Sequence, residues 1–193
     1  HPGGRLSSLT FGYTNDLRDS RSNTTRGAYS SFSAEIAGSF LGGETSFRKV
    51  QAEHRRYYTV REKDVLAFRV IGGISIGDLP LFESYSVGGA NTLRGYEEDR
   101  FRGKRMLLGT VEYRHPLSDS LSIVGFVDAG DAFGGRFDTP VPGFTVTAED
   151  ESFSSHVGAG VGMRVVTPLG PLRLDFGWGD EGSQAHFSFG QTF

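Results

Sequence analysis

The sequence contains no cysteine, no apolar run as long as a membrane helix, and no excess of basic residues. The absence of cysteine excludes a disulfide framework, a thiolate metal site and a cysteine nucleophile. A membrane helix needs roughly 20 consecutive apolar residues, so a helical membrane protein is also excluded. The net charge is −3 at pH 7, and no basic field is therefore present to hold nucleic acid.

Helical periodicity is missing as well, because no window of helical length repeats its apolar residues every 3.6 positions. Apolar and polar residues alternate instead, which is typical of strands with two different faces. Gly (28 residues) and Phe (16 residues) are both more frequent than in an average soluble domain. The alternation predicts about nine strands, at residues 6–14, 28–40, 46–59, 65–77, 105–115, 121–131, 154–167, 171–179 and 186–193.

The lengths and spacing of these strands favour an all-β, antiparallel meander that forms a transmembrane β-barrel. Strands of about ten residues or more suit a tilted membrane crossing. Tight connections at 60–64, 116–120 and 168–170 alternate with longer ones, as on the two rims of an outer-membrane barrel. In such a barrel the apolar faces meet lipid and the polar faces line a lumen. A soluble β-sandwich, whose apolar faces form a core, has the same alternation and stays open as an alternative.

The connection 78–104 is much longer than the others. Structureless connections of this length are uncommon in compact domains and are usually functional or disordered. Disordered segments are poor in aromatic residues, yet this one contains Phe82, Tyr85, Tyr96 and Phe101. We therefore expect an ordered loop that packs on another part of the molecule.

Two further features invite a ligand-binding interpretation without supporting it. Gly158, Gly160 and Gly162 are spaced G-x-G-x-G rather than G-x-G-x-x-G, and no helix follows them. They predict a slot without side chains, where the backbone of the long loop 78–104 packs closely against the strand. The histidines lack metal-ligand spacing. We expect no enzymatic activity, no metal and no cofactor.

Several short motifs resemble those of the BamA superfamily of outer-membrane translocases and assembly factors, and they occur in the family's order. In the long loop, Gly88-Gly89 and Leu93-Arg94-Gly95-Tyr96 resemble the motif of the family's sixth loop. The resemblance covers nearly all of the chain. The remaining matches are residues 13–27, in which Thr24 stands where the family usually has proline, and residues 111–116, 126–130, 167–175 and 187–193.

The resemblance implies both a fold and a site. Family members resemble sixteen-stranded barrels that follow POTRA domains, so residues 1–193 are expected to be the C-terminal part of such a barrel, without POTRA domains. The family's sixth loop folds back into the lumen, which implies that Arg94 meets Asp128 and Glu112. Strand parity agrees, because both acids alternate with apolar residues and so share the polar face. The planar guanidinium suits two carboxylates.

The resemblance also implies a function in the bacterial outer membrane, which is to help other proteins insert into that membrane or cross it. The implied partners are the lipid bilayer, unfolded outer-membrane proteins, POTRA domains and accessory lipoproteins. The last strand is expected to be one lip of a gate, because an exposed edge strand can template an incoming strand. We expect Phe187, Phe189 and Phe193 to form a C-terminal assembly signal and, with Tyr113 and Trp178, an outer aromatic belt.

Three other functions remain open at this point: a two-partner secretion pore, a short structural outer-membrane barrel, and a soluble sandwich adhesin. A barrel of about eight strands has an interior only wide enough for its own side chains. It could not also hold the loop 78–104. We therefore expect a piece of a larger barrel, in which residues 6–14 do not pair with residues 186–193.

Overall fold

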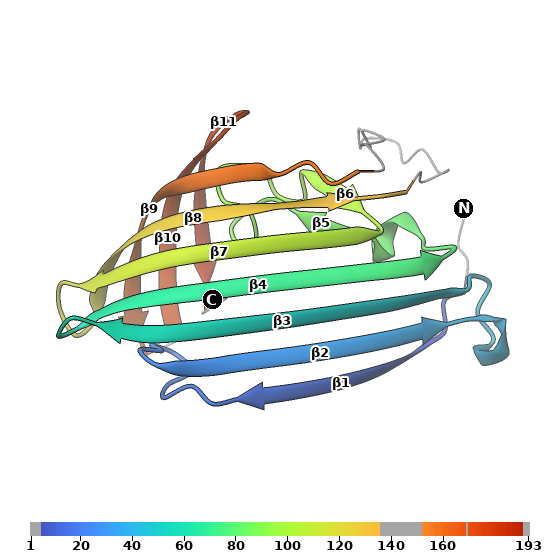
Figure 1. Cartoon of the computed structure of the whole chain (residues 1–193), viewed down its shortest axis with the longest axis horizontal. Coiled ribbons are helices and arrows are strands. Elements are labelled where there is room, and N and C mark those ends of the chain that lie inside the picture. The colour runs from blue at the N-terminus through green and yellow to red at the C-terminus, as the bar shows by residue number, and fades with distance from the viewer. Residues whose placement is uncertain (1–4, 136–151, 169, 191–193) are drawn as a thin grey trace.

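We describe the protein from a computed structural model, which describes residues 5–135, 152–168 and 170–190. Nine long strands form one antiparallel sheet in the order β1-β2-β3-β4-β7-β8-β9-β10-β11 (Figure 1). Two short strands, β5 (Tyr85–Val87) and β6 (Phe101–Gly103), pair in the connection between β4 and β7. The bounds of the long strands are β1 Ser8–Asp16, β2 Gly27–Ala37, β3 Phe47–Val60, β4 Asp64–Gly77, β7 Arg105–Pro116, β8 Leu121–Phe133, β9 His156–Thr167, β10 Gly170–Gly179 and β11 Gly182–Phe189.

The predicted meander is confirmed, and the strand bounds differ from the predicted ones by at most a few residues. The largest difference is at β11, which begins at Gly182 rather than at residue 186. Gly182 has a positive φ of 135°, and this glycine closes the β10–β11 hairpin after Asp180 and Glu181. The expected medium-length connection is therefore a tight turn.

Helices contribute almost nothing to the described residues. The two helical segments there are the 3₁₀ turns η1 (Ser39–Leu41) and η2 (Leu81–Glu83). Neither these turns nor any other helix among the described residues is long and apolar enough to span a membrane.

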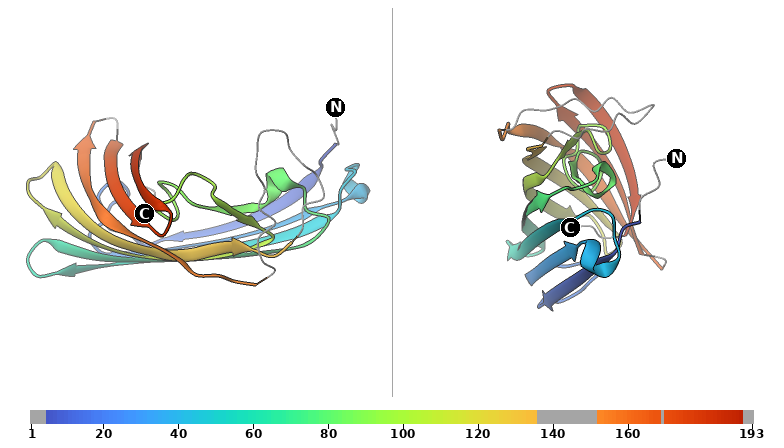
Figure 2. Two further views of the ribbon diagram at one scale, coloured as in Figure 1. Left: turned by 90° about the horizontal axis from the view of Figure 1, so that it is seen from above. Right: turned by 90° about the vertical axis from the view of Figure 1, so that its right-hand side faces the viewer.

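The sheet curves into a trough, and the connection between β4 and β7 lies on its concave side (Figure 2). The apolar side chains point to the opposite, convex face, where residues such as Val111, Val127 and Val161 are exposed. No second sheet packs on this apolar face in the described part of the chain. The sandwich alternative is therefore wrong, because a sandwich would bury these side chains in a core.

β1 and β11 are the two edges of the sheet, and they do not pair with each other in the part of the chain that is described. The described sheet is thus open. The sheet also bends along its width, so that in Figure 1 β10 and β11 run steeply across the direction of β1 to β4.

Candidate functional site

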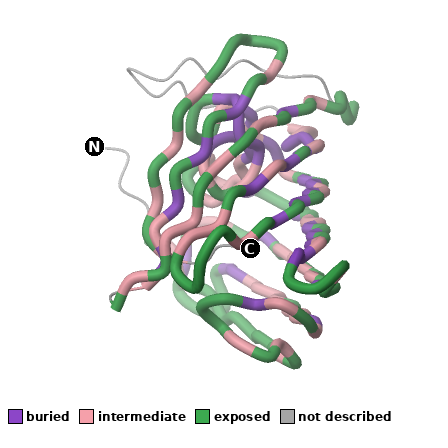
Figure 3. Tube along the Cα trace, turned by 90° about the vertical axis from the view of Figure 1, so that its left-hand side faces the viewer, coloured by how far each residue is buried: buried purple, intermediate pink, exposed green. Residues whose placement is uncertain are grey.

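The loop 78–104 is ordered and covers the concave face of β4, β7 and β8. Its apolar side chains, among them Leu93, Tyr96 and Phe101, join strand residues in one buried cluster. In Figure 3 buried segments gather where the loop meets the sheet. Gly88, Gly89 and Gly95 have φ values of 128°, 93° and 100°. These values are rarely adopted by residues with a side chain, so the glycines allow the tight path of the loop.

Arg94 lies at the centre of this interface and is held by two strands. Its Nε and Nη2 donate to Oδ2 and Oδ1 of Asp128 on β8, at 2.7 and 2.9 Å. Its Nη1 donates to Oε2 of Glu112 on β7, at 2.8 Å. The backbone N–H of Arg94 donates to Asp128 as well, at 3.1 Å. The structure thus brings together the three residues that the motif resemblance joined, and the side chains of all three are at most 3% exposed.

Phe126 adds a contact that sequence reasoning missed. The guanidinium carbon of Arg94 lies 3.5 Å from the centre of the Phe126 ring. Phe126 precedes Asp128 by two positions on β8, so the two side chains share the concave face. The Phe-x-Asp spacing therefore supplies a carboxylate and an aromatic platform to the same arginine, which strengthens its hold by a cation–π contact.

A ring of further arginines, also missed, surrounds the acids. Glu112 accepts from Arg114 Nε at 2.7 Å and from Arg164 Nη2 at 3.1 Å. Asp175 on β10 accepts from Arg164 Nη1 at 2.6 Å and lies 3.7 Å from Arg94 Nη1. A buried carboxylate needs such partners, because burial without them costs several kcal/mol per charge. Alternation could have placed these arginines on the concave face, but it could not have shown which acid each one meets.

Hydrogen bonds and ion pairs attach the remainder of the loop to the strands at several more places. Arg69 on β4 donates to the carbonyl of Asn91 at 2.7 Å and to Glu53 at 2.6 Å. At the far end, Arg100 forms a bidentate pair with Glu181 in the β10–β11 turn, with both distances at 2.7 Å. The loop therefore connects β3 and β4 to the last hairpin of the sheet.

Of the three glycines on β9 that were predicted to pack against the loop, only Gly158 does so. A Cβ at Gly158 would lie 1.8 Å from the carbonyl oxygen of Arg94, so the loop backbone does pack there. At Gly160 it would meet the Phe126 ring and the backbone of β10, and at Gly162 the carboxylate of Asp175. Besides Gly158, the loop packs on two glycines of β10 rather than on Gly160 and Gly162. A Cβ at Gly177 would meet the backbone N of Gly95 at 2.6 Å, and a Cβ at Gly179 would meet the Tyr96 ring at 2.5 Å.

The aromatic residues of the expected belt lie near both rims of the sheet rather than in one band. Tyr113, Trp178, Phe187 and Phe189 are all exposed, whereas Phe193 lies outside the described residues. Trp178 stands beside the β10–β11 turn, opposite Ser183, and Phe189 ends β11. Phe189 lies six positions after Ser183, which is about 20 Å along a strand. The aromatics thus lie toward both rims, as in barrels with two aromatic girdles.

Among the described residues, no cluster of histidines and acids could hold a metal ion. His156 stacks on Phe101 with ring centres 3.9 Å apart. His186 on β11 lies with its Nε2 3.4 Å from the backbone N of Gly95. Both histidines therefore pack against the loop.

Comparison with known families decides the classification. Residues 4–193 match the family model described as the Omp85 superfamily domain. The chain belongs to the Omp85 superfamily. Such proteins reside in outer membranes, so the apolar convex face of this sheet meets lipid.

Relatives of this Omp85 chain come from bacteria and from organelles. The chain is 29% identical over 206 residues to the outer membrane protein assembly factor BamA of Nitratidesulfovibrio vulgaris, covering 94% of this chain and 25% of the relative. It is 34% identical to the chloroplastic outer envelope protein 80 of Arabidopsis thaliana, over 64% of this chain and 17% of that protein. A SAM50-like protein of Schizosaccharomyces pombe is 26% identical, with coverages of 88% and 39%.

The fold is similar to that of BamA from Haemophilus ducreyi in a crystal structure that lacks POTRA domains 1–3. The TM-score is 0.75 at 16% identity, and the match covers 94% of this chain and 40% of that one. The chain thus spans a quarter of the BamA relative and less than half of the solved structure.

Proposed function

We propose that this Omp85 chain forms the part of a larger β-barrel that carries the lumen loop, and that the barrel inserts other proteins into the outer membrane. The observation that carries the proposal is the position of Arg94, which attaches the loop to β7 and β8 from the concave side. The names of two relatives, an assembly factor and a SAM50-like protein, support the same activity. The proposed activity involves conformational change and binding rather than covalent catalysis.

Further strands would complete the barrel at the free edges of β1 and β11. The tight turns at 61–63 and 117–120 lie on one rim, and the strand ends that lead into and out of the longer connections β4–β7 and β8–β9 lie on the other. Because outer-membrane barrels have short periplasmic turns, we assign the rim with the tight turns to the periplasm. POTRA domains and accessory lipoproteins, if they accompany this barrel, would then act on that side.

The edge strand β11 is the proposed contact for an unfolded substrate. Its unpaired backbone groups can hydrogen-bond to an incoming strand. Phe187 and Phe189 project from its apolar face, in agreement with a role in recognition during assembly. The loop contacts the same hairpin through Arg100 and Glu181, so the state of the loop can influence how firmly the edge is held.

The test is to measure insertion of a reporter barrel protein into vesicles that contain the full-length protein. Arg94→Ala should lower the insertion rate at least tenfold, as expected from a loss of more than about 1.4 kcal/mol in a buried ion pair. Arg94→Lys should be intermediate, because an ammonium cannot reproduce the bidentate fork. Arg21→Ala is the matched control, since the side chain of Arg21 is 86% exposed.

Heat-modifiable electrophoretic mobility shows whether each variant keeps a folded barrel. A folded Arg94→Ala protein with unchanged insertion would refute the role of the loop. If the wild-type protein does not accelerate insertion of the reporter but lets a soluble substrate cross the vesicle membrane, the protein is instead a secretion pore.

A further inference from the structure

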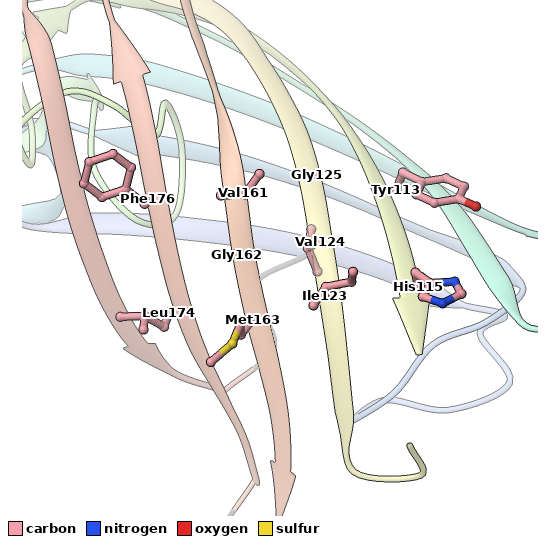
Figure 4. Close-up of a pocket in the computed structure, with 10 residues that line it drawn as sticks. All are labelled: Tyr113, His115, Ile123, Val124, Gly125, Val161, Gly162, Met163, Leu174 and Phe176. Atoms are coloured by element: carbon pink, nitrogen blue, oxygen red, sulfur yellow. The ribbon is translucent and has the colours of Figure 1, made fainter. Parts of the chain in front are cut away.

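A hollow of about 530 Å³ lies on the convex face of β7 to β10, opposite the loop, and nothing in the proposed function uses it (Figure 4). The strand register explains its shape. One cross-strand row consists of Tyr113, Gly125, Val161 and Phe176. The residues of this row lie side by side on one face, and Gly125 leaves a gap in it.

The neighbouring row toward the periplasmic rim consists of His115, Ile123, Met163 and Leu174. Both rows are visible in Figure 4, with Gly125 between the Tyr113 and Val161 positions. A Cβ at Gly125 would meet no atom within 4 Å. The floor of the hollow is therefore bare backbone, and its walls are aromatic and aliphatic side chains.

The row toward the opposite rim is filled more evenly. It consists of Val111, Val127, Ala159 and Trp178, and each position carries a side chain. The hollow is thus a local feature of two rows rather than a general property of the convex face.

Polar groups occur at one end of the hollow only. Tyr113 Oη donates to Asp64 Oδ2, and His115 Nδ1 lies 2.7 Å from Asp64 Oδ1. An ionised carboxylate only accepts hydrogen bonds, so Nδ1 of His115 carries the hydrogen and the ring is fixed in orientation. His115 and Asp64 stand at the ends of β7 and β4, next to the tight turns. The polar end therefore lies at the depth of lipid head groups, where aromatic side chains with a polar tip concentrate.

We propose that this hollow is a binding site for one acyl chain of a phospholipid, with the head group at His115 and Asp64. Its volume lies within the range of about 300–1,000 Å³ that is typical of small-molecule sites. A hydrocarbon chain fills the gap at Gly125 and restores the dispersion contacts that an unfilled void would lose. The choice of phospholipid rests on the proposed orientation, which turns the polar end toward the periplasmic leaflet.

The first experiment extracts the full chain from vesicles of phosphatidylethanolamine and phosphatidylglycerol, and counts the retained lipids by native mass spectrometry. Wild type should keep one phospholipid. Gly125→Leu fills the gap, and retention should fall about tenfold, as expected when several methylene groups lose their apolar contacts. Gly109→Leu is the matched control, because Gly109 is on the same face of the neighbouring strand β7 and its nearest atom is 3.9 Å away.

The second experiment needs no variant and so does not depend on the folding of Gly125→Leu. A phospholipid with a photoreactive acyl chain is incorporated into the same vesicles, and the labelled residues are mapped. Labelling should be enriched at Ile123, Val161 and Phe176 relative to Val70 and Ile74, which are also exposed on the convex face.

Three results would overturn the proposal. The first is equal lipid retention in wild type and Gly125→Leu. The second is even labelling across the convex face. The third is a protein dimer that Gly125→Leu dissociates, because the hollow would then be an interface between copies. If Arg94→Ala loses reporter insertion but retains the lipid, lipid binding in the hollow is independent of the proposed function of the loop.

Discussion

β7 and β1 have the same alternating pattern but differ sharply in burial. On β7 the residues of the concave face are buried and those of the convex face are exposed. On β1 every residue except Asp16 is exposed, including Thr10, Gly12 and Thr14 on the concave side. The difference is the loop 78–104, which covers β7 but not β1. On β7, burial of the polar face is therefore produced largely by the loop, whereas Tyr57, Val65 and Ala67 of β3 and β4 form a buried cluster that contains no loop residue.

The charges follow the same division. The covered region places Arg94, Glu112, Asp128 and Asp175 in one network of buried ion pairs. The uncovered face of β1 carries the small residues Thr10, Gly12 and Thr14, and its charged residue Asp16 pairs with Arg18 at the end of the strand. Substitutions in the covered region should consequently be costly, and equivalent substitutions near β1 should be mild.

The largest effect is expected for Asp128→Ala. This change removes the acceptor of Nε, Nη2 and the backbone N–H of Arg94 and leaves only Nη1 with its partner Glu112. Breaking a buried pair in this way costs about 3–5 kcal/mol. Hydrogen exchange of the amides in residues 88–101 should become much faster, while the strands stay protected. The control is Glu35→Ala on β2, which lies opposite Lys49 in the register and should cost at most about 1 kcal/mol. Equal exchange in the two variants would show that the pair does not hold the loop.

The second effect is expected for Gly158→Ala, compared with Gly12→Ala. Both glycines are on the concave face, but a Cβ at Gly158 would lie 1.8 Å from the Arg94 carbonyl, and one at Gly12 would meet nothing within 4 Å. Because the obstructing atom belongs to the backbone, the loop must shift, at a cost of about 1–3 kcal/mol. Denaturant unfolding in detergent should show this loss for Gly158→Ala and none for Gly12→Ala. A loss of similar size in both would mean that the loop does not rest on Gly158.

The comparison of β7 with β1 also shows which features of the fold and of the site could be predicted from the sequence. Alternation predicted the strands and the face of each residue, since a side chain's face follows from its position along a strand. It therefore placed Glu112 and Asp128 on the concave side. Which residues the loop touches depends on its path, and alternation carries no information about that path. Phe126, Arg164 and Gly177 were missed for this reason, and Gly160 and Gly162 were assigned to the loop incorrectly.

The motif resemblance supplied what alternation could not. It joined Arg94 to two acids on other strands, although no local pattern links residues 94 and 128. Arg114 pairs with Glu112, and Arg173 Nη2 lies 3.2 Å from Asp175 Oδ2. Both arginines lie outside the loop motif, and physical reasoning finds them only when the burial of Glu112 and Asp175 is known.

A smaller effect is expected for Tyr96→Phe. The hydroxyl of Tyr96 donates to the carbonyl of Val157 at 3.2 Å and accepts from the backbone N–H of Asp180 at 3.1 Å. Removing it leaves the ring in its buried place and loses two neutral hydrogen bonds, at about 0.5–1.5 kcal/mol each. Proteolysis of the loop under native conditions should be faster by about tenfold, as expected for roughly 1.4 kcal/mol. Unchanged proteolysis would show that the ring alone holds this part of the loop.

The smallest effect concerns the pair of Arg100 and Glu181 at the rim, where both side chains are partly exposed. The hydrogen bond from Arg100 lowers the pKa of Glu181 below its ordinary value of 4.5. A lowered pKa means that the pair stabilises the loop above pH 4.5 and stops doing so as the pH falls through the pKa of the folded protein. The contribution is about 0.5 kcal/mol, because solvent screens an exposed pair. Glu181→Gln should therefore raise hydrogen exchange near Arg100 slightly at pH 7 and not at all at pH 3. The same difference at both pH values would show that the charge of Glu181 has no part in holding the loop to the last hairpin.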